Sequence, residues 1–169
     1  MEKLGVRFVD NYITDSEQSY ILDQINLIRN NSPKIIASYG DFNMDSMYFG
    51  KRYKKNALDF PEFLVSLSQK LMDDNFFIEQ PFGVSINQYK KGQKIGAHID
   101  KPISGPLVTI LSLNSTATML FKRKNQEDII YELTPRSVIQ LKDEIRNDWT
   151  HEILPVKDLR YSIVFRSLQ

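Results

Sequence analysis

The sequence contains no cysteine and only two histidines, His98 and His151. Without cysteine, disulfide bonds, thiolate zinc sites and cysteine nucleophiles are excluded. Any metal ion must therefore be held by His, Asp or Glu side chains.

Long hydrophobic runs are also missing. No apolar run approaches the roughly 18 to 20 residues that a membrane-spanning helix requires. The first residues, Met1-Glu2-Lys3-Leu4, do not begin a signal peptide. We therefore expect a soluble intracellular protein of the cytoplasm or nucleus, without a membrane partner.

Neither sign of charge is in excess, because 22 Lys and Arg oppose 21 Asp and Glu, for a formal charge of +1. Binding of a polyanion would have to come from local basic patches. Hydrophobic residues make up 41% and charged residues 25%, the usual balance of a soluble globular protein. A chain of 169 residues is long enough for one domain with a real core, so we expect a single domain over residues 1–169.

The first part of the chain predicts a short strand and two helices. Residues 4–13 are typical of a strand, and Thr14-Asp-Ser-Glu17 forms a capping box that begins a helix extending to about Arg29. Phe60-Pro61 begins a second helix, because proline is tolerated in the first turn. The apolar stripes expected to be buried are Ile21, Leu22, Ile25 and Ile28 in the first helix, and Phe63, Leu64, Leu67 and Leu71 in the second.

After residue 75 the pattern changes to short strands. They are predicted at residues 83–89, 107–113, 118–122, 129–133, 137–141 and 161–166. Several short strands after two helices indicate an α+β domain, mainly β, whose sheets close over one another.

The stretch of residues 85–100 ends in His98-Ile-Asp100. Residues two apart on a strand point to the same face, so both side chains could reach one cavity. With His151 from a distant strand they would supply two nitrogens and one oxygen, the set that holds non-haem Fe(II) and leaves positions open. The same set can hold zinc. The alternative is a buried histidine beside a solvated aspartate, since this spacing alone is a weak signal.

The last predicted strand places charged side chains on one face. Alternation puts Arg160, Ser162 and Arg166 together, on an otherwise apolar strand. A buried guanidinium is costly unless it meets an anion, and its fork suits a carboxylate, so a small dicarboxylate would satisfy both arginines. Asn87 and Tyr89 share a face and could offer an amide and a phenol to the same ligand. Alternatively, both arginines pair with acidic side chains or reach solvent at an edge strand.

Together these motifs resemble the AlkB family of Fe(II)/2-oxoglutarate dioxygenases. The family's order is found here as Asn87-x-Tyr89, His98-x-Asp100, His151 and Arg160-x-Ser162-x-x-x-Arg166. The segment 142–151 is also similar, because an arginine and an aromatic residue precede the histidine. The resemblance is close over residues 84–166 and covers the first 80 only in outline.

The resemblance implies a double-stranded β-helix, or jelly roll, with flanking N-terminal helices. Residues 1–80 would supply helical support and a substrate-covering segment, and residues 81–169 the catalytic core. The implied metal and catalytic residues are His98, Asp100 and His151. The implied cosubstrate-binding residues are Arg160, Ser162 and Tyr89 at the far carboxylate of 2-oxoglutarate, and Asn87 and Arg166 near its C1 carboxylate.

The resemblance also implies an oxidoreductase that uses Fe(II), 2-oxoglutarate and O2. Such enzymes convert 2-oxoglutarate to succinate and CO2 while they hydroxylate a C–H bond, and a hydroxylated N-methyl group is released as formaldehyde. Family members act on alkylated DNA or RNA, on a modified tRNA base or on proteins. We expect demethylation or hydroxylation of a modified nucleobase, as in DNA or RNA repair. The alternatives are the same chemistry on a protein side chain, or an inactive iron-binding scaffold.

Residues 34–56 have no clean period but are rich in aromatic residues interleaved with basic ones, and such rings could stack on bases while the cations hold phosphates. The candidate substrate-binding residues are Tyr48, Phe49, Arg52, Tyr53 and, from the matched segment, Arg146. Further basic residues near the metal motif are Lys90, Lys91, Lys94 and Lys101. Pro102 stands where base-repair members often have an aspartate, so no base-reading residue is assigned there. Alternatively, the segment covers the core with solvated lysines, and Arg146 has a structural partner.

Overall fold

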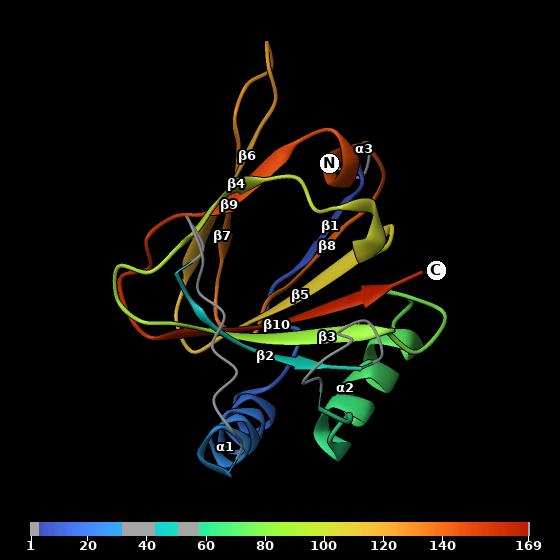
Figure 1. Cartoon of the computed structure of the whole chain (residues 1–169), viewed down its shortest axis with the longest axis vertical. Coiled ribbons are helices and arrows are strands. Elements are labelled where there is room, and N and C mark those ends of the chain that lie inside the picture. Colours follow the sequence, from blue (N-terminus) through green and yellow to red (C-terminus); the bar gives the residue numbers. More distant parts are fainter. Residues whose placement is uncertain (1–3, 32–42, 51–57, 169) are drawn as a thin grey trace.

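Two antiparallel β-sheets face each other in the protein (Figure 1). The computed structural model describes residues 4–31, 43–50 and 58–168. The six-stranded sheet has the order β1 (Val6–Val9), β8 (Val138–Leu141), β5 (Leu107–Leu113), β10 (Arg160–Ser167), β3 (Gly83–Tyr89) and β2 (Asp45–Phe49). The four-stranded sheet has the order β4 (Ile95–His98), β9 (Thr150–Ile153), β6 (Ala117–Lys122) and β7 (Ile129–Leu133). The expected mainly β, jelly-roll class is confirmed.

Two helices pack on the outer face of the six-stranded sheet (Figure 1). They are α1 (Asp15–Asn31) and α2 (Glu62–Asp73), close to the predicted bounds. Two short helices, η2 (Pro102–Ser104) and α3 (Asp143–Asn147), lie in loops. Among the described residues, no helix is long and apolar enough to cross a membrane.

Strand alternation gives the protein two cores. On β10, Ile163 and Phe165 point toward the helices and belong to the core that contains Leu64 and Leu71. Val164 points the other way, into the core between the two sheets, with Phe121 of β6. The residues that alternate with Ile163 and Phe165 therefore face the space between the two sheets.

The structure contains short elements for which the sequence pattern predicted no bounds, namely β2, β4, β9 and α3. Each of these strands has only four or five residues and is formed by pairing, β2 with β3 and β4 with β9. Strands β1 and β2 come from the first 80 residues yet belong to the six-stranded sheet. The division of the chain at residue 80 stays a prediction.

The capping box of α1 should stabilise the fold measurably. The amide of Glu17 donates to Thr14 Oγ1 at 3.1 Å, and Thr14 N donates to Glu17 Oε2 at 2.7 Å. We expect Thr14→Ala to lower the unfolding free energy by about 1 kcal/mol. The amide of Glu17 loses its acceptor, and the reciprocal bond from the amide of residue 14 to Glu17 is weakened. Urea denaturation measures this loss. The control Ser16→Ala, at an exposed position two residues later, should change stability by less than about 0.5 kcal/mol.

Candidate metal centre and anion pocket

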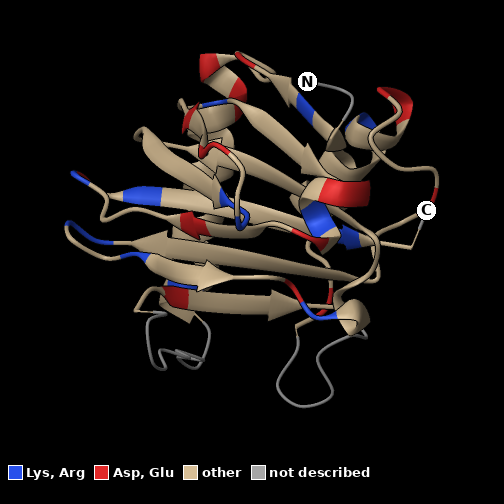
Figure 2. Ribbon diagram, turned by 90° about the horizontal axis from the view of Figure 1, so that it is seen from above, with Lys and Arg blue, Asp and Glu red and all other residues tan. Residues whose placement is uncertain are grey.

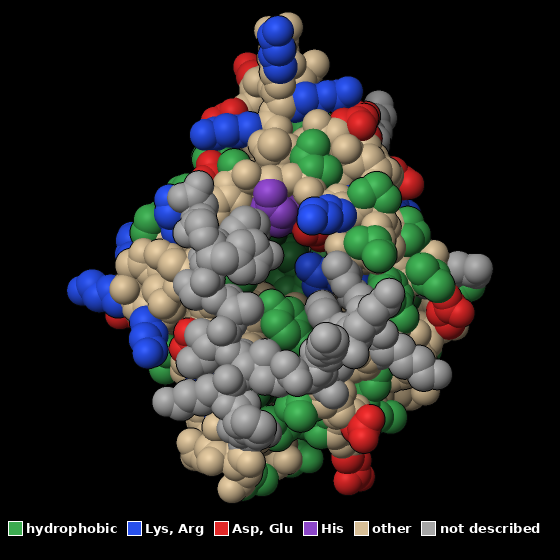
Figure 3. Space-filling view, viewed as in Figure 1, with side chains coloured by type: hydrophobic (Ala, Val, Ile, Leu, Met, Phe, Trp, Pro, Cys, Tyr) green, Lys and Arg blue, Asp and Glu red, His purple; other side chains and the backbone are tan. Residues whose placement is uncertain are grey.

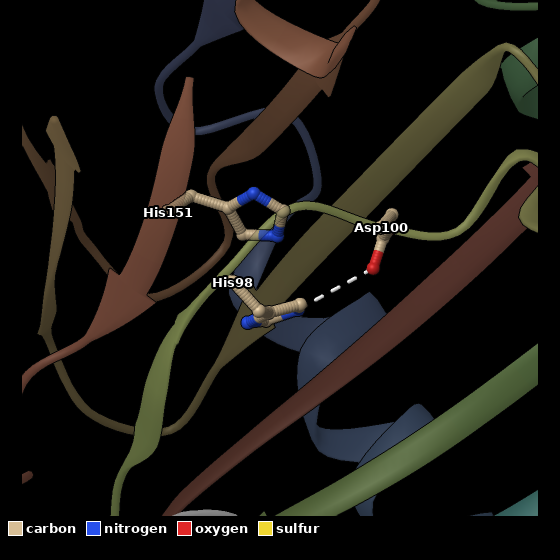
Figure 4. A group of neighbouring side chains, drawn as sticks. All are labelled: His98, Asp100 and His151. Atoms are coloured by element: carbon tan, nitrogen blue, oxygen red, sulfur yellow. Dashed lines mark ion pairs between the residues drawn. The ribbon is translucent and has the colours of Figure 1, made fainter. Parts of the chain in front are cut away.

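Three side chains converge between the sheets (Figure 4). His98 of β4 and His151 of β9 are direct cross-strand partners, and their ring centroids are 4.4 Å apart. Asp100 follows two residues after β4 ends. One ligand atom from each residue lies within 4.8 Å of the others, so the three form a candidate iron site.

Asp100 is held outside a strand, which differs from the expectation that both residues of the His98-x-Asp100 motif lie on one. Its Oδ1 lies 3.3 Å from His98 Nε2, and its Oδ2 lies 3.8 Å from Arg166 Nη2. Burial alone would raise the pKa of Asp100, but the hydrogen bond from His98 and the charge of Arg166 together lower it well below the usual value. The carboxylate is therefore charged at neutral pH, as a metal ligand must be.

Both imidazoles are prepared for coordination. Burial, with the nearby charge of His98, lowers the pKa of His151 to about 4, so His151 is neutral at pH 7. His98 Nδ1 lies 2.8 Å from the carbonyl oxygen of Gly96. A proton on Nδ1 would donate to this carbonyl and leave Nε2 as the ligand atom. The donor set of two imidazole nitrogens and one carboxylate fits Fe(II).

The pKa of His151 predicts how stability changes with pH in the metal-free protein. Below pH 6.5 the unfolded chain binds a proton at this residue, whereas the folded protein does so only near pH 4. Stability from His151 is thus complete above pH 6.5 and falls by about 3 kcal/mol as the pH drops toward 4. Urea denaturation across this range measures the slope. His151→Gln should show a shallower slope, and an unchanged slope would contradict the assignment.

A buried arginine lies in the same space with most of its hydrogen bonds unmade. Arg160 is 1% exposed, and its Nε donates to Ser112 Oγ at 3.2 Å. Its Nη1 and Nη2 have no hydrogen-bond partner. The guanidinium carbon lies 5.0 Å from the ring centroid of Tyr89. Among the described residues no acidic side chain pairs with Arg160, so the alternative of an ion pair with Asp or Glu does not hold for this residue. Two buried donors are left for an anion.

A row of small polar side chains crosses four strands beside Arg160. The row is Ser46 of β2, Asn87 of β3, Ser162 of β10 and Ser112 of β5, each opposite the next in the sheet. Ser46 Oγ donates to Asn87 Oδ1 at 2.7 Å, and Asn87 Nδ2 lies 3.5 Å from Ser162 Oγ. Ser46 and Ser112 were missed from the sequence, because a serine in a strand carries no signal of its own. Their hydroxyls fix the amide of Asn87 and the guanidinium of Arg160.

Arg160 and the row of polar side chains are here called the anion pocket. Arg166 lies on the same strand as Arg160 and contacts one of the candidate metal ligands. Besides Asp100, it contacts Ser85 Oγ through Nη1 at 3.5 Å, and its buried Nε has no partner. Arg146 and Arg166 thus both lie close to the carboxylate of Asp100, and Arg160 is buried on the same strand as Arg166. This excess of positive charge favours an anionic ligand.

The family follows from a comparison with known proteins. The family model described as the 2OG-Fe(II) oxygenase superfamily matches residues 5–166. The chain belongs to this superfamily. It is therefore an oxidoreductase, and the superfamily's chemistry uses Fe(II), 2-oxoglutarate and O2.

The oxygenase is similar in sequence to parts of longer proteins. It is 27% identical over 164 residues to mouse "tRNA (carboxymethyluridine(34)-5-O)-methyltransferase ALKBH8", covering 90% of the oxygenase and 24% of the mouse protein. The chain thus spans about a quarter of that relative. It is 25% identical over 189 residues to "Uncharacterized protein L905" of Acanthamoeba polyphaga mimivirus, covering 97% of the oxygenase and 85% of L905.

Solved structures show the same fold at low identity. OsALKBH1 superposes with a TM-score of 0.73 and 16% identity, covering 96% of the oxygenase and 98% of that chain. A prolyl hydroxylase from Trichoplax adhaerens, in complex with a peptide fragment, gives a TM-score of 0.72 and 14% identity. The match covers 98% of the oxygenase and 84% of the prolyl hydroxylase chain.

The predicted substrate-binding residues of the oxygenase do not lie together in one site. Tyr48 lies opposite Ser85, on the face of β2 that looks toward the site. Phe49 was predicted wrongly: it is 1% exposed and packs in the helix-side core, because neighbouring residues of a strand point to opposite faces. Arg52 and Tyr53 lie outside the described residues. Arg146 is 2% exposed and donates to backbone carbonyls, so its partners are structural.

Proposed function

We propose that this oxygenase demethylates or hydroxylates a modified nucleobase in DNA or RNA. One observation carries the proposal: a two-histidine, one-carboxylate cluster lies beside a buried guanidinium with two free donors, in an AlkB-like fold. Two relatives, from mouse and Xenopus tropicalis, carry the name tRNA (carboxymethyluridine(34)-5-O)-methyltransferase ALKBH8, and their names support a nucleic-acid substrate.

We assign His98, Asp100 and His151 as the iron ligands. The convergence of their donor atoms, the charged Asp100 and the neutral His151 support this. When bound, iron and 2-oxoglutarate would supply the oxidation of a substrate C–H bond by O2. The protein's part is to fix the ligands and to keep their protonation states.

We assign the anion pocket to 2-oxoglutarate. Arg160, with Ser162 and Tyr89, would bind the far carboxylate, and the two unpartnered Nη groups of Arg160 support this role. Asn87 and Arg166 would lie near the C1 carboxylate, which the contact of Arg166 with Asp100 supports. A dianion would offset the excess of guanidinium charge around Asp100.

Exposed basic residues close in sequence to the metal ligands support a contact with phosphates. Lys90 and Lys91 are exposed in the turn between β3 and β4, and Lys101 is exposed directly after Asp100. Figure 2 shows basic residues at several strand ends and turns on one side of the molecule. Figure 3 shows a histidine reaching the surface next to a basic side chain. Phosphate contacts of this kind would make binding weaken as salt rises.

The test measures the succinate formed from 2-oxoglutarate, and the formaldehyde released from the substrate, in reactions with N-methylated DNA and RNA oligonucleotides. Unmodified oligonucleotides and a proline-containing peptide are tested beside them. We expect a methylated oligonucleotide to stimulate succinate formation above the background without substrate. Formaldehyde would indicate demethylation, and succinate without formaldehyde would indicate hydroxylation. Stimulation by the peptide alone would overturn the nucleic-acid substrate and favour a protein side chain.

A further inference from the structure

Arg146 binds the loop that carries Asp100. It lies in α3, five residues before His151, and is buried. Its Nη1 donates to the carbonyl oxygen of Asp100 at 2.8 Å, and its Nη2 donates to those of Lys101 at 3.0 Å and Gly105 at 2.9 Å. One guanidinium thus holds both ends of a single loop.

The loop needs such a contact because no strand continues through it. Strand β4 ends at His98, so no β-ladder fixes the backbone of Asp100. Within the loop, two short turns join Ser104 N to Lys101 O and Gly105 N to Pro102 O. These turns shape residues 101–105 but leave the carbonyl of Asp100 to Arg146.

Gly105 brings the end of the loop close to β10. Its φ is +83°, and a Cβ at this position would lie 2.7 Å from the carbonyl oxygen of Ser167. A side chain is therefore strained and crowded there. The carbonyl of Gly105 is fixed where Arg146 can reach it, next to the strand that supplies Arg166.

The chemistry of the contact requires arginine. The acceptors are spread along a loop, and a planar guanidinium can donate to several of them at once, whereas an ammonium is a compact point charge. The charge also lies close enough to Asp100 for that carboxylate to offset part of the fall in the pKa of Arg146 that burial causes. Arg146 therefore holds the backbone of Asp100.

We propose that Arg146 is a positioning residue of the metal centre, which fixes Asp100 relative to His151. The segment that contains Arg146 leads directly into β9, where His151 lies. The segment from α3 to β9 then supplies His151 as one ligand and fixes the position of Asp100, another ligand. The proposal rests on the assignment of His98, Asp100 and His151 as ligands, and it is independent of the substrate.

The test compares Mn(II) binding, followed by electron paramagnetic resonance, in the native protein and in Arg146→Lys and Arg146→Met. We expect roughly 10- to 100-fold weaker binding in Arg146→Met, as for other residues that orient metal ligands, and a smaller loss in Arg146→Lys. Thermal unfolding of the metal-free proteins shows that each variant is folded. If Arg146→Met does not fold, Arg146→Lys alone still decides, because any weakening in a folded protein supports the proposal.

Arg7 provides the matched control. It also donates to two backbone carbonyls, of Asn75 at 3.0 Å and Asp74 at 3.1 Å, and it stacks on Phe76 of the helix-side core. Arg7→Met should lower stability and leave Mn(II) affinity unchanged. Native affinity in Arg146→Met, or equal weakening in Arg7→Met, would overturn the positioning role. A native protein that binds no Mn(II) would overturn the ligand assignment itself.

Discussion

Replacing Arg160 with methionine is expected to raise the KM for 2-oxoglutarate by about 30- to 4,000-fold, because truncating a buried charge partner typically costs about 2 to 5 kcal/mol. The unliganded protein should be no less stable than the native one. A buried guanidinium with two unpaired donors is costly, and an apolar side chain of similar volume in its place is often neutral or stabilising. Steady-state kinetics and thermal unfolding with and without 2-oxoglutarate measure both effects.

Arg123→Met is the control for this experiment. Arg123 lies after β6, is 38% exposed and pairs with Glu144 and with Asp148 at 3.5 Å. Its loss should leave the KM for 2-oxoglutarate unchanged. An Arg160→Met protein that is still stabilised normally by 2-oxoglutarate would show that the far carboxylate binds elsewhere. A large loss of stability without ligand would show that Arg160 has a structural partner instead.

Replacing His98 with alanine should lower metal affinity by at least about 100-fold, more than the loss of a residue that only orients a ligand. Succinate formation should fall with it. Because the His98 side chain is 24% exposed at the end of a short strand, folding should survive the change. Mn(II) titration of the metal-free proteins measures the affinity directly.

Lys101→Ala serves as the comparison for His98→Ala. Its side chain is exposed near the metal cluster, and the substitution keeps the carbonyl that Arg146 binds. Metal affinity should stay within about twofold of the native value, as for surface substitutions generally. Comparable Mn(II) binding in native and His98→Ala proteins would remove His98 from the ligand set.

The sequence predicted the elements that have a regular pattern. Alternation along β10 placed Arg160 and Ser162 on one face and Phe165 on the other, as the structure has them. The capping box of α1 and the buried stripe of α2 were also correct, because caps and helical periodicity are local signals. Residue type and the resemblance both suggested that the two histidines meet, but their direct cross-strand pairing could not be predicted, since β4 and β9 are paired by tertiary contacts rather than by local propensity.

Other features could not be predicted because they depend on pairing partners. Phe49 was assigned to the substrate because β2 was not recognised, and the face of each side chain is unknown until the strand is. Arg146 gave no sign of its three carbonyl acceptors, since backbone oxygens occur at every residue. The hydroxyls of Ser46 and Ser112 become meaningful only when four strands are aligned.

The alternation of β10 between two cores also governs how the chain must fold. A slip of β10 by one residue against β3 and β5 would turn Arg160 and Arg166 into the helix-side core and Phe165 into the site. Misregistered molecules would therefore lose both their hydrophobic packing and their anion pocket. In a refolding experiment, the fraction of chains that regain 2-oxoglutarate binding would report the fraction that paired this strand correctly.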